Sequence, residues 1–154
     1  MTVLRILVPY NFASHERKAL DFVVNTFVGQ ENVKITLFHA YTPLPVVDMD
    51  ASPELAKMRG AMVTLSKELA EKEASIKATK KYLVDSGFSE DQLDYVFREK
   101  EKSVSDEIID VVTKGHYRVI VLSPTTVRVT RLFSRSTHSK LLSSLKDITI
   151  CIAV

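Results

Sequence analysis

The chain has 154 residues, of which 45% are hydrophobic and 26% are charged, and its formal net charge is +2. That length suits a single domain over residues 1–154, and so small a net charge excludes a protein that binds nucleic acid through bulk positive charge. No apolar run approaches the ~20 residues that span a bilayer, and the single cysteine, Cys151, cannot form an internal disulfide. We therefore expect a cytoplasmic domain that binds neither nucleic acid nor a membrane.

Five apolar runs predict β-strands, because they are rich in Val and Ile. In chain order they are Val3–Pro9, Val33–Tyr41, Leu93–Phe97, Tyr117–Leu122 and Ile148–Val154. The first, fourth and fifth are almost continuously apolar, which is typical of strands covered on both faces in a parallel sheet.

Helical periodicity separates these runs. In the first helix, Leu20, Val23, Val24 and Phe27 recur at the spacing of one helical face. The candidate caps are Ser14 and Gly29 for the first helix, Ser105 and Gly115 for the third, and Ser134 or Ser136 for the last. Strands that alternate with helices predict an α/β fold, a three-layer sandwich with helices on both faces of a parallel sheet.

The segment from Thr42 to Gly87 predicts an unusually long helix. Its apolar residues are spaced by three, four or seven positions: Leu55, Met58, Met62, Leu65, Leu69, Ile76 and Leu83. A helix of ~30 residues is about 45 Å long, whereas a strand of five or six residues spans ~17–20 Å. The helix therefore either overhangs the sheet or breaks, and Gly60 is the expected break. Its apolar stripe either packs on the sheet or binds a partner protein.

The sequence lacks the motifs of several well-known nucleotide-binding, catalytic and zinc sites. The chain contains no G-x-G-x-x-G, no G-x-x-x-x-G-K-[ST], no G-x-S-x-G, and no set of Cys and His at zinc-ligand spacing. We predict no catalytic residue and no metal site. His39 lies in a predicted strand among apolar neighbours, so we expect a hydrogen-bonded core histidine rather than a ligand.

Two loops that follow predicted strands are candidates for ligand binding, because ligands of open α/β sheets bind at the carboxyl ends of strands where the strand order reverses. One is "PYNFAS", residues Pro9 to Ser14. The other joins the fourth strand to the last helix and carries hydroxyls together with Arg128, Arg131 and Arg135. A helix N-terminus next to such a loop suits an anion. Alternatively, the hydroxyls are helix caps and the arginines are solvated.

These loops resemble one family, the universal stress proteins. The family's first motif, I-L-V-P-x-D-x-S, is matched by "ILVPYNFAS", with Asn11 where Asp is usual. Its second motif is G-x-x-G, nine residues, then G-[ST]. Here Leu122 and Thr125 take the first two glycine positions, and the nine-residue gap is kept. Arg135-Ser136-Thr137 then falls on the last glycine and the residues after it.

The resemblance implies a strand order of 3-2-1-4-5, a homodimer through the last strand, Ile148–Val154, and in one branch an ATP site. By motif position the adenine would lie near Pro9, Tyr10, Asn11 and Ala40, with Val121 below. The ribose and phosphates would lie on Leu122, Thr125, Arg135, Ser136 and Thr137. Another branch of the family lacks the glycines and does not bind ATP.

The replaced glycines favour that second branch. A Cβ at a residue that needs a left-handed conformation costs roughly 1–2 kcal/mol, and we expect Leu122 and Arg135 to add bulk where the ligand would lie. Our prediction is a non-enzymatic, dimeric stress-response domain without standard ATP binding and without a required cofactor. The alternatives are a switch that binds ATP or AMP, with slow hydrolysis at most, and a site for a simple anion.

Overall fold

In the computed structural model, which describes residues 2–12, 16–44, 53–123 and 135–154, five parallel strands form one sheet in the order β3-β2-β1-β4-β5. The strands are β1 (Leu4–Pro9), β2 (Val33–Tyr41), β3 (Leu93–Glu99), β4 (Val119–Leu122) and β5 (Thr149–Ile152). Every neighbouring pair is parallel, so the predicted sheet and its strand order are confirmed.

Strand ends differ from the predicted ones at both edges of the sheet. The strand β3 is two residues longer than predicted, because Arg98 and Glu99 pair with Ala40 and Tyr41 at the long end of β2. At the other edge, β5 is shorter than predicted, because its partner β4 offers only four residues. The most buried strands are therefore β1, β2 and β4, between the two edge strands.

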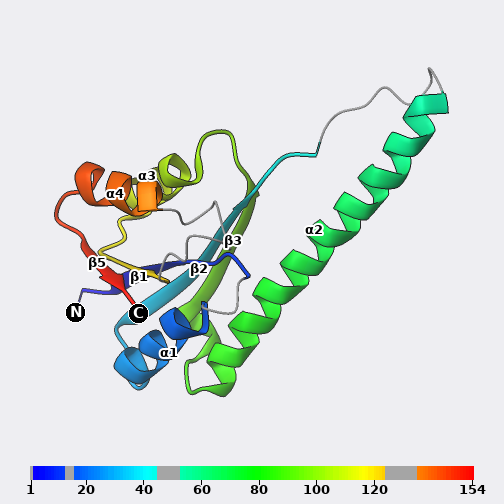
Figure 1. The fold of residues 1–154 in the computed structure, drawn as a ribbon. Helices are drawn as coiled ribbons and strands as arrows, with labels where there is room; N and C mark the ends of the chain where they lie inside the picture. Colours follow the sequence, from blue (N-terminus) through cyan, green and yellow to red (C-terminus); the bar gives the residue numbers. More distant parts are fainter. Residues whose placement is uncertain (1, 13–15, 45–52, 124–134) are drawn as a thin grey trace.

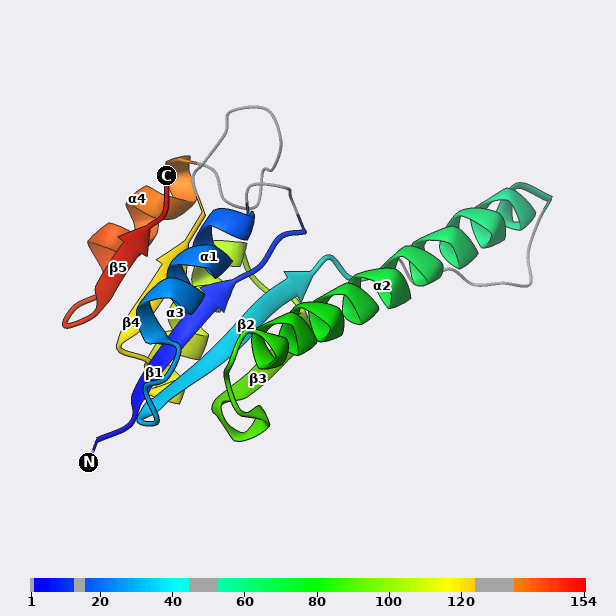
Figure 2. The same ribbon diagram turned by 90° about the horizontal axis from the view of Figure 1, so that it is seen from below.

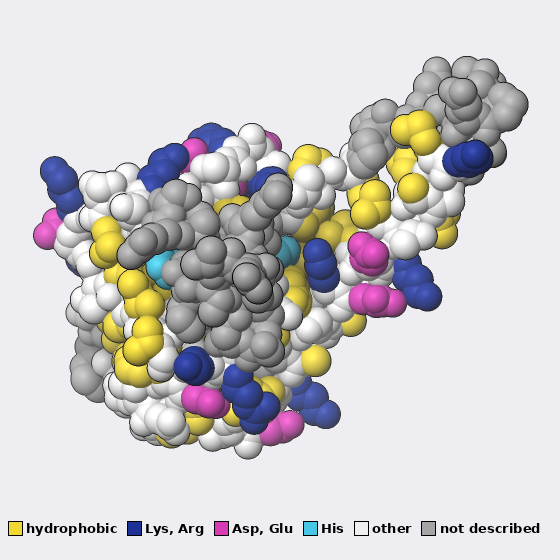
Figure 3. All heavy atoms as spheres, in the orientation of Figure 1, with side chains coloured by type: hydrophobic (Ala, Val, Ile, Leu, Met, Phe, Trp, Pro, Cys, Tyr) yellow, Lys and Arg dark blue, Asp and Glu magenta, His cyan; other side chains and the backbone are white. Residues whose placement is uncertain are grey.

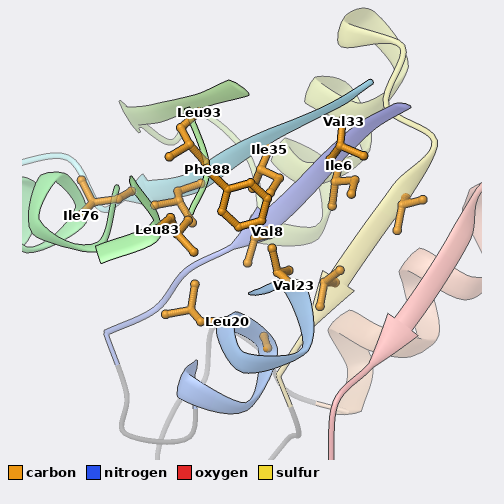
Figure 4. Close-up of a cluster of buried hydrophobic side chains, with 14 residues drawn as sticks. Ile6, Val8, Leu20, Val23, Val33, Ile35, Ile76, Leu83, Phe88 and Leu93 are labelled. Carbon is orange, nitrogen blue, oxygen red and sulfur yellow. The ribbon is translucent and has the colours of Figure 1, made fainter. Parts of the chain in front are cut away.

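In the described part of the chain, four α-helices cover the sheet: α1 (Glu16–Phe27), α2 (Pro53–Asp85), α3 (Val104–Gly115) and α4 (Arg135–Ser144), with a short 3-10 helix η1 (Glu90–Gln92) before β3. Side chains alternate between the two faces of a strand, so Ile6 and Val8 pack under α1 and α2 while Leu7 packs under α3 and α4. The first cluster is drawn in Figure 4 and the layers are visible in Figures 1 and 2. The predicted three-layer arrangement is confirmed.

The ends of α3 correct two predicted caps. The N-cap is Ser103, whose side chain accepts the backbone N–H of Asp106, while Ser105 is already inside the first turn and is buried. The residue with left-handed φ at the other end is His116, at 55°, and Gly115 still belongs to the helix. Gly115 leaves room for the ring of Tyr117, because a Cβ at this position would collide with that ring.

The end of α1 agrees with its predicted signal. Gly29 follows the helix with φ of 86°, in the left-handed region that glycine adopts at little cost. Of the other cap candidates, Ser14 and Ser134 lie outside the described residues, while Ser136 lies inside α4 and is not its N-cap.

The helix α2 runs without interruption for 33 residues, so of the two alternatives left open by the sequence it overhangs the sheet and does not break at Gly60. Such a helix is about 50 Å long, and Figures 1 and 2 show its N-terminal half extending well past the sheet. A glycine within a helix costs roughly 1 kcal/mol relative to alanine, which the flanking helix-forming residues offset. No helix in the described part of the chain is both long and apolar enough to cross a membrane.

Candidate functional site

The carboxyl ends of β1, β2 and β4 lie at the same end of the sheet. The direction in which successive strands are added to the sheet reverses between β1 and β4. The segment after β1 is tied to β2, because the backbone N–H of Tyr10 donates to the carbonyl of Phe38 at 2.7 Å. On the other side, Ile6 and Leu7 pair with Val119 and Ile120. This register brings six predicted site residues to the carboxyl end of the sheet: Pro9, Tyr10, Asn11, Ala40, Val121 and Leu122.

The remaining predicted residues belong to the second loop and the start of α4. Thr125 lies outside the described residues, as do Arg128 and Arg131. Arg135, Ser136 and Thr137 form the first turn of α4, and the structure describes their backbone only. Lys140 of α4 forms an ion pair of 2.7 Å with Asp106 of α3, which ties the start of α4 to its neighbour.

The side chain of Leu122 does not add bulk to the ligand space, contrary to our expectation. It is 1% exposed and belongs to the core cluster under α3 and α4, together with Leu7, Ala40 and Leu141. Val121, the preceding residue, points to the opposite cluster. Alternation along β4 explains both positions, because a strand residue beside a ligand still directs its side chain into one of the two cores.

An aromatic cluster occupies the ends of β1, β2 and β3. The ring of Phe12 lies edge-on to Tyr10 and to His39, each at 4.8 Å between ring centroids. His39 stacks on Phe97 at 5.7 Å, and Phe97 also contacts Tyr41 at 4.9 Å. Sequence reasoning missed Phe12, Phe97 and Tyr41, because aromatic residues at strand ends are ordinary core residues until the register of β2 and β3 is known.

Phe12 has a backbone φ of 66°, in the left-handed region. A non-glycine residue there carries a cost of roughly 1–2 kcal/mol, so the surrounding packing has to hold it in place. The contacts of its ring with Tyr10 and His39 supply part of that packing. The loop after β1 is therefore shaped around an aromatic side chain.

His39 is a buried, hydrogen-bonded histidine, as predicted. Its Nδ1 lies 2.8 Å from the backbone carbonyl oxygen of Tyr10, and a carbonyl only accepts, so Nδ1 carries the proton. Burial lowers the pKa of His39, the hydrogen bond to Tyr10 partly opposes this, and the positive charges of Lys72 and Lys100 lower the pKa further. The ring is therefore neutral at pH 7.

The helix α2 contacts the same loop through a hydroxyl pair. The side-chain oxygen of Thr79 lies 3.1 Å from the hydroxyl of Tyr10 and 3.0 Å from the backbone oxygen of Ser75. Thr79 is buried although it is polar. The long helix thus helps to fix the ring of Tyr10 beside Phe12.

A buried carboxylate fixes the neighbouring loop, between β3 and α3. Glu107 of α3 accepts the backbone N–H groups of Glu101 and Lys102 at 2.8 and 3.1 Å, and a guanidinium N–H of Arg98 at 2.8 Å. Burial raises the pKa of Glu107, but these hydrogen bonds and the charge of Arg98 lower it by more, so the pKa lies below its usual value. The carboxylate is ionised and holds the loop against α3.

The start of α4 contributes a buried histidine that sequence reasoning left unassigned. His138 is buried, and no described group hydrogen-bonds its Nε2; burial lowers the pKa of this ring. Asn11 and Ser123 are the other buried polar residues after β1 and β4. Among the described residues, no group of three or more His, Cys, Asp or Glu is placed to hold a metal ion.

The model of the universal stress protein family matches residues 2–146. The chain belongs to the universal stress protein family. No curated protein sequence matches it closely enough to count as a relative.

Solved universal stress proteins share this fold over almost the whole chain. The protein from Archaeoglobus fulgidus in complex with dAMP is 12% identical, with a TM-score of 0.65 and coverage of 100% of both chains. The protein UspA from Lactobacillus plantarum is 16% identical, with a TM-score of 0.62 and coverage of 100% of this chain and 99% of that chain. A universal stress protein in complex with cAMP is 12% identical, with a TM-score of 0.61 and coverage of 100% and 98%. At these identities the likeness shows the fold alone.

Proposed function

We propose that residues 1–154 form a single cytoplasmic domain that acts as a non-enzymatic, dimeric regulator of the universal stress type, without standard ATP binding. The observation that carries this proposal is the aromatic cluster of Tyr10, Phe12 and His39 at the ends of β1 and β2. The family resemblance puts adenine at this place. Here the ring of Phe12 packs between the two neighbouring side chains, and Asn11 replaces an acidic residue that would carry charge.

A switch that binds an adenine nucleotide is the second candidate. Two proteins of the same fold were solved in complex with dAMP and with cAMP. The helix α4 has ten residues and begins at this edge, so its free N–H groups suit a phosphate. The same features suit a simple anion, with Arg128, Arg131 and Arg135 as the predicted contacts. This candidate places the ligand on α4 and not on the aromatic cluster.

Nucleotide carried through purification separates the two candidates. The protein is denatured, and the released material is measured by absorbance at 260 nm and by mass. Calorimetry of nucleotide-free protein with ATP, AMP and inorganic phosphate follows. We expect no released nucleotide and no ATP binding below millimolar concentration. Micromolar binding of ATP or AMP by the unaltered chain would establish the switch instead, and heat from phosphate alone would establish the anion site.

A variant that restores the family pattern tests why binding is absent. Thr125→Gly and Arg135→Gly together with Asn11→Asp restore two glycines and the acidic residue, and Leu122 is left in place because it belongs to the core. Phe12→Gly on this background removes the ring that, in this proposal, takes the place of adenine, and it relieves the positive φ. We expect measurable ATP binding only after the change at Phe12. Binding before that change would mean that the glycines, and not the aromatic cluster, decide affinity.

The dimer belongs to the same proposal. The strand β5 lies at one edge of the sheet and, among the described residues, pairs only with β4. Ile152 and Val154 at its end are exposed. Apolar edge strands promote aggregation unless they are paired or covered, so we expect β5 to meet β5 of a second copy across a two-fold axis.

A further inference from the structure

The long helix α2 carries one apolar stripe that changes from buried to exposed along its length. Towards the C-terminal end, Ile76 and Leu83 are fully buried in the core cluster under α1 and α2. Towards the N-terminal end, Met58 and Leu65 are 45% and 40% exposed. These residues belong to a single series with spacings of three and four: Met58, Met62, Leu65, Leu69, Lys72, Ile76, Thr79 and Leu83. The stripe is therefore continuous, but the sheet covers only part of it.

The uncovered part is the segment 57–70, which we call the arm. Figures 1 and 2 show it beyond the end of the sheet, and Figure 3 shows hydrophobic side chains along it. Where the arm leaves the sheet, a shallow groove of about 430 Å³ is lined by Leu69 together with Tyr41, Leu44 and Phe97. An exposed helix without a partner would have no use for an apolar residue every third or fourth position.

We propose that the arm pairs with the arm of a second copy of this chain, antiparallel and across a two-fold axis. A spacing that alternates three and four is the pattern by which two helices interlock side chains. The stripe is self-complementary when the axis passes between Met62 and Leu65. Met62 of one copy then faces Leu65 of the other, and Met58 faces Leu69. A shift by one heptad would set Met62 against Lys72, so this register is the one that buries all four apolar residues.

Charge selects the antiparallel orientation. The outer end of the arm carries Lys57 and Arg59. The stretch 67–73, at and just past its inner end, carries three acidic residues, Glu68, Glu71 and Glu73, against two basic ones, Lys67 and Lys72. In the antiparallel register, the basic end of one arm lies level with the acidic region of the other. A parallel pair would set basic residues beside basic residues. Opposite charges that flank an apolar seam set the orientation of paired helices.

The pairing is expected to be reversible. Four apolar residues from each copy cover about two heptads, so the contact lies towards the small end of specific interfaces, which bury ~1,200–2,000 Å². The arm does not have to fold on binding, since Ile76 and Leu83 anchor the same helix to the sheet. A preformed helix loses less conformational entropy on association than a disordered one.

Sedimentation of matched variants tests the contact. Leu65→Glu places a charge at the centre of the proposed seam, whereas Val63→Glu places the same charge on a residue that is 69% exposed and outside the stripe. Neither residue is buried within the chain, so both variants should keep the melting temperature of the parent protein. We expect Leu65→Glu to halve the mass of the associated species at tens of micromolar and Val63→Glu to leave it unchanged. An equal mass for Leu65→Glu and the parent overturns the proposal.

Disulfide trapping tests the register. On a Cys151→Ser background, protein with Met62→Cys is mixed with protein with Leu65→Cys under mild oxidation. The antiparallel seam predicts that the mixture cross-links faster than either protein alone, because only the mixed pair lies at the same level. Val63→Cys is the control and should stay uncross-linked over the same time. Cross-linking that is fastest for Met62→Cys alone would mean a parallel pair and contradict the proposed geometry.

Discussion

At the scale of single residues, His39 should make stability depend on pH. Burial lowers its pKa in the folded state below the ordinary value of 6.5, so the unfolded chain takes up the proton more readily. The contribution of His39 to stability is therefore full above pH 6.5. It falls as the pH drops from 6.5 to the folded pKa, by about 1.4 kcal/mol for each pH unit in that window, and it is constant below the folded pKa. Denaturant unfolding at pH 7 and pH 5 measures this loss. His39→Asn keeps a donor near the carbonyl of Tyr10 and should flatten the dependence. The slope that remains comes from His138, whose pKa burial also lowers, and near pH 5 from carboxylates with lowered pKa values, such as Glu107.

Glu107 should contribute to stability through its backbone contacts. Glu107→Gln keeps one acceptor for the N–H groups of Glu101 and Lys102 but removes the charge that pairs with Arg98. We expect the free energy of unfolding to fall by about 1–3 kcal/mol, the usual range for losing hydrogen bonds to a buried charge. The control is Asp110→Asn, since Asp110 contacts the same guanidinium at 3.6 Å but is more exposed, and its effect should be much smaller. Equal effects would mean that Glu107 acts only through Arg98.

Individual residues also show what a sequence can and cannot predict. The environment of His39 was predictable, because a histidine within an apolar strand has to be buried and paired. The place of Phe12 was not, since a left-handed φ at a non-glycine residue has no sequence signal. The direction of Leu122 was misjudged because motif position says which residue lies near a ligand but not which face of the strand its side chain takes.

At the scale of elements, two glycines that lack close neighbours should respond in opposite directions to alanine. Gly60 lies within the continuous helix α2, so Gly60→Ala should stabilise the arm by about 0.5–1 kcal/mol. Gly29 has φ of 86°, so Gly29→Ala should destabilise the protein by roughly 1–2 kcal/mol, although a Cβ there also meets open space. Hydrogen exchange over residues 57–69 reports the first change and thermal unfolding the second. Faster exchange in Gly60→Ala would indicate a break after all.

The continuous α2 decides an alternative that the sequence left open at this scale. Chain geometry correctly required that a helix of this length either overhang or break, but it could not choose between them. The choice depends on the free energy of one exposed glycine, which is small next to the hydrogen bonds of the turns around it. The predicted ends of β3 and β5 were wrong for a related reason. The length of each strand is decided by its partner in the sheet and not by its own residues.

At the scale of the whole molecule, the fold was predictable because independent signals agreed. Alternating strands and helices, continuous apolar strands and the family motifs all indicated the same parallel sheet, and the family resemblance alone implied the strand order that the structure has. Assembly is a different problem, since a sequence does not say which apolar surface remains uncovered once the chain has folded. The structure leaves two such surfaces among the described residues, the edge of β5 and the arm of α2.

The alternating direction of the backbone N–H groups in β5 allows a specific test of its proposed pairing. Thr149 and Ala153 donate their N–H groups to β4, so the N–H groups of Ile150 and Ile152, by alternation, face the outer edge. Ile152→Pro therefore removes an outward donor, a change that edge strands tolerate, whereas Ala153→Pro removes a donor to β4. On a Leu65→Glu background, which removes the contact of the arms, we expect a dimer that Ile152→Pro converts to a monomer with little loss of stability. Ala153→Pro should instead lower the melting temperature. A mass that Ile152→Pro leaves unchanged would exclude β5 as the interface.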